Sequence, residues 1–204
     1  MLKIFTDFFS NTPYVDILAV LSGIIYVILA ARNHILCWIF GIIGSSLTMY
    51  SVFFNYNLYL ETFLNGFYVA AAIWGWMNWN KQKNSTKQIK SYSFVQHLPI
   101  IGTAMCVVLF TGYIFDNYTG SSAPYLDAFT TVFALMTTFM IGMRILENWL
   151  YWMLIDSASI YLYSSRGAYF YVILFSVYII VSISGYLQWR KEYRSYGNSK
   201  TQEI

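Results

Sequence analysis

The pentapeptide GWMNW, Gly75 to Trp79, returns in a related form near the carboxyl terminus as GYLQW, Gly185 to Trp189. Each copy closes an apolar run and follows the pattern glycine, aromatic residue, any residue, amide, tryptophan. At the same offset two tyrosines of each run also match, Tyr59 with Tyr169 and Tyr68 with Tyr178. A chance match is the alternative, because aromatic belts recur at the ends of membrane helices. We interpret the pattern as two related halves of one chain.

The composition indicates that the chain lies in a membrane. Of its 204 residues, 58% are hydrophobic and only 10% are charged, whereas a soluble domain carries about 25% charged residues. The two cysteines, Cys37 and Cys106, both fall inside apolar stretches. We therefore expect small buried side chains and no disulfide framework.

Seven apolar runs are long enough to cross a hydrocarbon core about 30 Å thick, for which roughly 17 to 25 helical residues suffice. The runs are continuous, which favours helices over the short alternating segments of a membrane barrel. The predicted helices are Val15–Ala31, Ile35–Phe54, Leu58–Trp79, Val95–Phe115, Tyr125–Gly142, Asn148–Ser164 and Ala168–Trp189. The predicted fold is an all-α membrane protein with one transmembrane domain over residues 1–204.

The matching helix ends divide the seven helices into two triplets and one linking helix. Repeat one covers about 15–79, the linking helix 95–115 and repeat two about 125–189. One linking helix returns the chain to the starting side, so the repeats run parallel, an arrangement known in transporters. Further upstream, CWIFGIIGSSLTMY from Cys37 loosely parallels YWMLIDSASIYLY from Tyr151.

The positive charges predict the orientation, because cytoplasmic loops carry an excess of lysine and arginine. Ten basic residues fall on one side of the membrane, and two, Lys3 and Arg166, fall on the other. The ten are Arg32, Lys81, Lys83, Lys87, Lys90, Arg144, Arg190, Lys191, Arg194 and Lys200. We expect an external amino terminus and a cytoplasmic carboxyl terminus. The net charge of +3 then reflects topology and not a nucleic-acid surface.

Several acids near the ends of the predicted helices have more than one explanation. Asp16 and Asp127 begin their helices, so capping and interfacial exposure explain them at least as well as a function does. Glu61 lies near the start of its helix, and Asn65 and Tyr68 continue the same stripe at helical spacing. This stripe either lines a binding site or holds helices together.

Asp156 is harder to explain, because it lies at the centre of its predicted helix, Asn148–Ser164. It is therefore about 12 Å from either end of the helix, where no cap is needed. An acid at this depth costs about 2.5 to 3.5 kcal/mol on insertion scales and usually faces a cavity or a partner. The residues at helical spacing around it are Trp149, Trp152, Ser159 and Tyr163, which share its face of the helix.

A carboxylate flanked by aromatic rings is suited to a cationic, partly aromatic ligand. The negative charge offsets the ligand charge, and each ring face adds roughly 0.5 to 2 kcal/mol of attraction. Hydroxyls and amides would hold a neutral polar part of the ligand. The alternative is a structural aspartate that bonds to a Thr, Asn or Tyr of a neighbouring helix. The candidate ligand residues are Asn148, Trp149, Trp152, Asp156, Ser159, Tyr163, Glu61, Asn65 and Tyr68.

Two stretches, WIFGIIGSSLTMYSVFFNYNLYLETFLNGFYVAAAIWGWMNW (Trp38 to Trp79) and ENWLYWMLIDSASIYLYSSRGAYF (Glu147 to Phe170), resemble the Pnu family of bacterial vitamin transporters. The most specific part is Trp-x-x-Trp-x-x-x-Asp or Asn, here Trp149, Trp152 and Asp156, which in the family belongs to the substrate site. The resemblance implies a 3+1+3 fold related to SWEET proteins, a homotrimer embedded in inner-membrane lipid, and facilitated diffusion. It also implies that a cytoplasmic kinase traps the substrate by phosphorylation.

Members of this family carry nicotinamide riboside, thiamine or riboflavin, and the first two contain a fixed positive charge on an aromatic ring. An acid at position 156 argues against neutral riboflavin. The acid itself, the additional Glu61 and the form Asn-Trp-x-Tyr-Trp-x-x-x-Asp from Asn148 look more like the thiamine branch. We therefore expect thiamine, with nicotinamide riboside as the alternative.

Two other functional classes deserve comparison with a transporter. An enzyme is disfavoured, because His34 and His97 lie far apart and neither a zinc-binding His-Glu-x-x-His motif nor a Gly-x-Ser-x-Gly motif occurs. We expect no cofactor and no metal. A vitamin-binding receptor or the binding subunit of a larger transporter is the second alternative, because a ligand site alone does not establish release on the far side.

Overall fold

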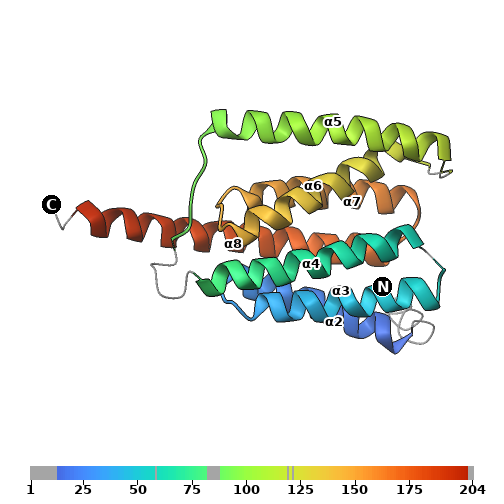
Figure 1. Ribbon diagram of the computed structural model, residues 1–204, viewed down its shortest axis with the longest axis horizontal. Helices are drawn as coiled ribbons and strands as arrows, with labels where there is room; N and C mark the ends of the chain where they lie inside the picture. The colour runs from blue at the N-terminus through green and yellow to red at the C-terminus, as the bar shows by residue number, and fades with distance from the viewer. Residues whose placement is uncertain (1–12, 58, 82–87, 119, 121, 202–204) are drawn as a thin grey trace. The chain divides into compact units, whose positions relative to one another are not determined.

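The computed structural model describes residues 13–57, 59–81, 88–118, 120 and 122–201, and within these residues the chain forms seven helices (Figure 1). They are α2 (Tyr14–Ala31), α3 (Cys37–Phe54), α4 (Tyr59–Lys81), α5 (Phe94–Tyr118), α6 (Pro124–Gly142), α7 (Asn148–Ser165) and α8 (Tyr169–Thr201). The prediction of an all-α protein is confirmed, and each predicted run corresponds to one helix. The largest difference is in α8, which continues past Trp189 into the basic tail.

Five of the described helices, α2, α3, α5, α6 and most of α8, are long and apolar enough to cross a membrane. The other two are long enough but more polar: α4 has 23 residues and α7 has 18. Glu61 and Asn65 interrupt the apolar sequence of α4, and Asn148 and Asp156 interrupt that of α7. The structure therefore confirms a multi-pass helical protein, and the crossing of α4 and α7 stays a prediction. These two helices carry all the predicted ligand residues.

The chain divides into an N-terminal unit, residues 1–87, and a C-terminal unit, residues 88–204. In the N-terminal unit α3 packs against both α2 and α4. In the C-terminal unit α6 packs against α5 and α7, and α7 packs against α8. The predicted linking helix, α5, thus belongs to the C-terminal unit. There Gly112 lets α5 approach α6 closely, because any side chain at this position would overlap the ring of Tyr125.

The core of the C-terminal unit lies where α5, α6 and α7 meet. Buried side chains from all three helices form it: Ala104, Val108, Ala128, Phe133, Ala134 and Ile155. Half-buried aromatic residues of α7, including Trp152, pack against this cluster. Trp152 therefore points towards the α5–α6 side of α7.

The turns that follow α2 and α6 share one backbone conformation. Asn33 and Arg144, which hold equivalent positions after these two helices, have φ angles of 51° and 57°, a region in which non-glycine residues are uncommon. The next residues, His34 and Ile145, each donate a backbone hydrogen bond to the carbonyl five positions earlier, at 3.0 and 2.9 Å. After α3 and α7, Asn57 and Gly167 again have positive φ angles, of 56° and 70°.

An acid in the first turn of α2 and of α6 ties that helix to the end of the next one. Asp16 accepts a hydrogen bond from the hydroxyl of Tyr56 at 2.8 Å, and Asp127 pairs with the guanidinium of Arg166 at 2.8 Å. Both contacts are partly exposed and lie at helix ends. The interfacial explanation of Asp16 and Asp127 is therefore consistent with their surroundings.

Candidate functional site

The polar and aromatic face of α7 lies along α8. The two helices are antiparallel and joined by a short turn, so residues pair in opposite order along them (Figure 1). Trp149 meets Gly185 at one end of the pair, and Tyr163 meets Tyr171 at the other. In the same register Asp156, midway between them, lies opposite Tyr178. Trp149 and Tyr163 thus make aromatic contacts with α8 at the two ends of the pair, with Asp156 between them, whereas Trp152 packs against the core formed with α5 and α6.

Trp149 closes the end of the pair nearer the α6–α7 turn. Its indole is fully buried, and a Cβ added to Gly185 would lie only 2.7 Å from its Cε2. The ring of Trp189 meets it edge-on, with centroids 5.5 Å apart and an interplanar angle of 87°. These contacts are those of a residue that packs two helices together, while a role for Trp149 in binding stays a prediction.

The N-terminal unit repeats this arrangement with Trp38 in the position of Trp149. A Cβ on Gly75 would lie 2.5 Å from the Trp38 ring, and Trp79 meets that ring edge-on at 5.4 Å and 89°.

Asp156 is a buried acid that no side chain among the described residues neutralises. Only 2% of the residue is exposed, yet within the described part of the chain its carboxylate makes neither a hydrogen bond nor an ion pair. The structural alternative, a bond to a Thr, Asn or Tyr of another helix, therefore finds no support there. Ser159, one turn further along, is also buried and has no side-chain hydrogen bond to the described residues. A positively charged ligand would provide the counter-charge that the described residues do not supply.

Other polar atoms around the first half of α7 are also buried and lack a hydrogen-bond partner in the described ranges. They include the indole nitrogens of Trp149 and Trp152, Oδ1 of Asn148 and Oγ1 of Thr137. The Asn148 amide nitrogen, in contrast, donates to the carbonyl of Ile145 at 2.6 Å, which leaves its oxygen as an acceptor. Donors, an acceptor and a hydroxyl are what a sugar or amide group of a ligand needs.

Thr137 on α6 was missed by the sequence analysis. At the offset that relates Asn33 to Arg144, Thr137 and Trp152 correspond to Tyr26 and Gly41, which contact each other: a Cβ on Gly41 would lie 3.2 Å from the Tyr26 ring. This correspondence predicts that Thr137 lies near Trp152. The available signal was the pair Thr137-Thr138 in the middle of an apolar helix, where only Thr138 bonds its own helix, to Ala134 O at 2.8 Å.

Tyr163 takes part in a stack of aromatic rings at the turn end of the pair. Its ring stacks on Tyr171 with centroids 4.9 Å apart and on Phe175 with centroids 5.4 Å apart. Phe175 in turn meets Tyr178 edge-on at 6.1 Å. The rings therefore form a continuous series from the turn to the neighbour of Asp156.

The α4 candidates belong to the N-terminal unit, whereas the α7 candidates belong to the C-terminal unit. Glu61 is exposed, and Asn65 donates its amide hydrogen to the Glu61 carbonyl of its own helix at 2.8 Å. Tyr68 is half-buried. Within this unit the three residues do not form a single hydrogen-bonded group, so their part in a binding site stays a prediction.

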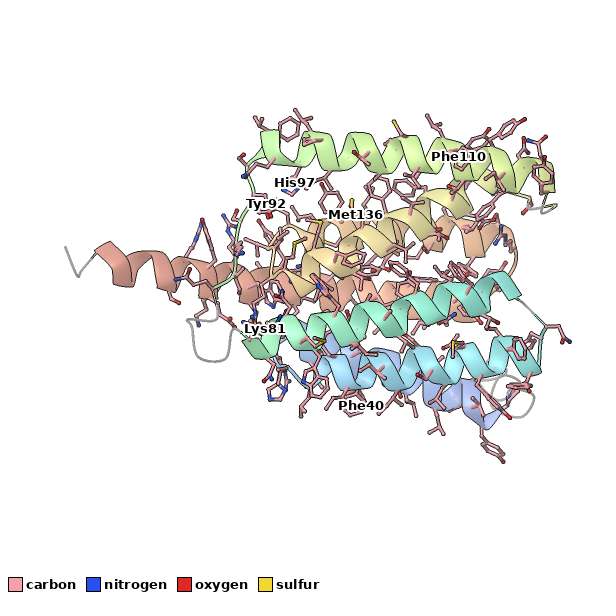
Figure 2. The ribbon with its side chains drawn as sticks, viewed as in Figure 1. Phe40, Lys81, Tyr92, His97, Phe110 and Met136 are labelled. Carbon is pink, nitrogen blue, oxygen red and sulfur yellow. The ribbon has the colours of Figure 1, made fainter. Side chains whose placement is uncertain are left out.

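A second polar cluster, which the sequence analysis did not predict, surrounds Glu147 just before α7. Its carboxylate accepts a hydrogen bond from the Ser91 hydroxyl at 2.6 Å and from the Tyr92 amide at 3.0 Å. Nε2 of His97 lies 3.9 Å from the same group, and Nδ1 of His97 contacts the Tyr151 hydroxyl at 2.9 Å. Figure 2 shows Tyr92 and His97 side by side where the chain enters α5. This cluster fastens the segment before α5 to the start of the helix that carries Asp156.

Backbone pairing strengthens this attachment. Lys90 donates its amide hydrogen to the carbonyl of Arg144 and accepts one from Leu146, both at 2.8 Å, in an isolated parallel bridge. The signal in the sequence was an acid, Glu147, directly before the helix start. Its partners come from a distant part of the chain, before α5, so spacing alone does not reveal them.

The two cysteines, Cys37 and Cys106, are both free, which confirms the prediction of unpaired thiols. Cys37 is buried, as expected, whereas Cys106 is exposed on α5, so the expectation of a buried side chain is wrong for Cys106.

Known proteins are similar to this chain over most of its length, both in sequence and in fold. The sequence profile of a family described as nicotinamide mononucleotide transporter matches residues 13–191. The nicotinamide riboside transporter PnuC of Neisseria mucosa is 26% identical over 196 residues, which cover 90% of this chain and 74% of the relative. The nicotinamide riboside transporter PnuC of Escherichia coli is 22% identical over 219 residues, with 92% and 90% covered. A crystal structure of the vitamin B3 transporter PnuC superimposes with a TM-score of 0.73 at 23% identity, over 93% of this chain and 86% of that one.

Proposed function

Because the chain belongs to the nicotinamide mononucleotide transporter family, we propose that it carries nicotinamide riboside across the membrane. The observation that carries the proposal is Asp156, a buried carboxylate on α7 with neither a hydrogen bond nor an ion pair to the described residues. The pyridinium ring of nicotinamide riboside has a fixed positive charge that such a carboxylate offsets. A buried charge is tolerated in a membrane protein where a ligand or a cavity faces it.

The polar atoms around Asp156 fit the uncharged part of the same molecule. The indole nitrogen of Trp152 is a donor, and the Asn148 oxygen is an acceptor. A ribose and a carboxamide offer complementary groups to both. We propose that Ser159 and Thr137 add hydroxyls to this site, and that Trp149 encloses it at one end.

The substrate differs from the thiamine that the sequence analysis preferred. The named relatives transport nicotinamide riboside, so the comparisons favour the alternative. The preference for thiamine rested on an acid in place of an amide at position 156 and on the additional Glu61. A carboxylate pairs with a pyridinium as well as with a thiazolium, and Glu61 is exposed, so neither observation distinguishes the two vitamins.

We further propose that the helices form two three-helix repeats, α2 to α4 and α6 to α8, with α5 between them. The shared turns at Asn33 and Arg144 and the equivalent packing of Trp38 and Trp149 support this arrangement. The polar stripe of α4 remains among the proposed ligand residues. The amino terminus lies outside the bacterial inner membrane and the carboxyl terminus inside. Three copies assemble as a homotrimer, and a cytoplasmic kinase traps the substrate after facilitated diffusion.

Calorimetry with the purified protein tests the substrate directly. Nicotinamide riboside and thiamine are titrated side by side, and heat from the first alone is the expected result. Uptake into liposomes that contain only this protein then separates a transporter from a receptor. Binding of thiamine but not of nicotinamide riboside would restore the first expectation, and binding without uptake would refute transport.

A further inference from the structure

We infer that Tyr171 and Phe175 form an access site for flat aromatic cations on the route to Asp156, and that Tyr163 fills this site while no substrate passes. The inference rests on the proposed function, because it concerns how a cationic ring reaches the carboxylate. It adds a second, transient binding site to the one around Asp156.

The first support is the geometry of the stack. Tyr163 lies at interplanar angles of only 28° and 29° to Tyr171 and Phe175, with centroids 4.9 and 5.4 Å away. A pyridinium is a flat six-membered ring of the same size as the phenol ring of Tyr163, so it can take the place of that ring against both neighbours. A cation is attracted to an aromatic face when it lies within about 6 Å of the ring centroid. The charge therefore makes the exchange favourable.

The second support is the position of the stack along α8. Tyr171, Phe175 and Tyr178 follow each other at intervals of four and three positions, so they line one face of the helix. Tyr178 lies opposite Asp156. The rise along the helix from Tyr171 to Tyr178 is about 10 Å. A cation at Tyr171 is therefore one short step, past Phe175, from the carboxylate.

The third support is a contrast between the two ends of the α7–α8 pair. At the Trp149 end the indole is fully buried and presses against a glycine, so it has no room to move. At the Tyr163 end the ring is half-buried, and 43% of Tyr171 is exposed. Tyr163 also lies in the last turn of α7, close to the turn at Gly167. A side chain there changes its rotamer without moving the helices.

Rates of binding, measured by stopped-flow tryptophan fluorescence, test the access site with nicotinamide riboside as the probe. Tyr171→Leu removes one ring face, and we expect the association and dissociation rates to fall by the same factor, at least threefold, while Kd stays within twofold. A site on the route alters both rates equally because it is empty in the final complex. Tyr171→Phe keeps the ring face and should slow both rates less than Tyr171→Leu does.

A matched control is Tyr161→Leu, which removes another ring of α7 that is 71% exposed and is expected to leave all rates unchanged. Tyr163→Ala removes the ring that occupies the access site but keeps the Tyr171 and Phe175 rings that form it. The association rate should therefore rise at least twofold. A change in Kd with Tyr171→Leu, unchanged rates, or slower association with Tyr163→Ala would overturn the inference. A failure of the unmodified protein to bind nicotinamide riboside would instead overturn the proposed function. That binding is measured first, before any variant is made.

Discussion

The indole of Trp149 occupies the space that a side chain at Gly185 would need, because a Cβ there would lie 2.7 Å from its Cε2. Real side chains do not approach one another so closely, and the buried indole also meets the ring of Trp189 edge-on. We expect Gly185→Ala to lower the free energy of unfolding by about 1 to 3 kcal/mol, the usual cost of overpacking a core. Thermal unfolding in detergent measures it.

A suitable control is Gly102→Ala on α5, where no heavy atom lies within 4 Å of the added Cβ. Alanine is favoured over glycine inside a helix by roughly 1 kcal/mol, so this variant should be as stable as the unmodified protein or slightly more stable. Equal stability of the two alanine variants would show that the α7–α8 packing tolerates a shift, contrary to the prediction.

The charge of Asp156 should determine affinity more than stability. Asp156→Asn keeps the shape of the side chain and removes the charge, so we expect Kd for nicotinamide riboside to rise at least tenfold, equivalent to about 1.4 kcal/mol. The protein should still insert and fold, because a buried amide costs less than a buried unpaired carboxylate. Calorimetry gives Kd, and thermal unfolding reports the fold.

Asp127→Asn is the matched control for the loss of one acid. Asp127 forms a partly exposed pair with Arg166 at the end of α7, and such pairs contribute only about 0 to 1 kcal/mol. Substrate affinity should not change in this variant. If both substitutions weaken binding equally, the general negative potential attracts the substrate, and no specific role belongs to Asp156.

Glu147 should contribute to the attachment of α5 and of the segment before it. Glu147→Gln replaces two charge-assisted hydrogen bonds, from Ser91 and Tyr92, with weaker neutral ones. We expect a loss of about 1 to 3 kcal/mol in stability, together with faster hydrogen exchange at the Lys90 and Leu146 amides of the adjacent bridge.

Asp116→Asn provides the control for this prediction, because Asp116 is an exposed acid on α5, the helix whose attachment is tested. Its substitution should alter neither melting temperature nor exchange at the bridge. Unchanged exchange at Lys90 in Glu147→Gln would mean that backbone pairing alone holds the segment.

The helices and the buried acid could be predicted from the sequence because both depend on local patterns. The apolar runs predicted the bounds of each helix to within a few residues, except at the end of α8, where the basic tail continues the helix without an apolar pattern. Asp156 was identified because its depth follows directly from counting residues along one run. The same counting placed Trp149 and Tyr163 on its face.

Contacts between distant segments could not be predicted in this way. The Glu147 cluster joins residues that lie far apart in the sequence, and the packing of Trp149 depends on a glycine in another helix. Thr137 was overlooked because a hydroxyl in a membrane helix normally bonds its own backbone, as Thr138 does.

Thr137 permits a prediction in which stability and function change in opposite directions. Its hydroxyl is buried and has no hydrogen-bond partner in the part of the chain that the structure describes, so the folded protein carries the cost of an unsatisfied polar group. Thr137→Val removes that hydroxyl at nearly constant volume, and we expect stability to rise by about 1 kcal/mol. If the hydroxyl serves the substrate, affinity for nicotinamide riboside should fall about threefold to tenfold in the same variant.

Thr138→Val separates this effect from a general response of α6 to valine. The Thr138 hydroxyl bonds the Ala134 carbonyl at 2.8 Å, so its loss should lower stability by about 0.5 to 1 kcal/mol and leave affinity unchanged. Thermal unfolding gives the stability of each variant, and calorimetry gives its affinity for nicotinamide riboside. A Thr137→Val protein that is more stable and binds as tightly as before would place this hydroxyl outside the substrate site. Its unsatisfied state would then be a packing defect of α6, whereas a paired gain in stability and loss in affinity would locate one edge of the site opposite Trp152.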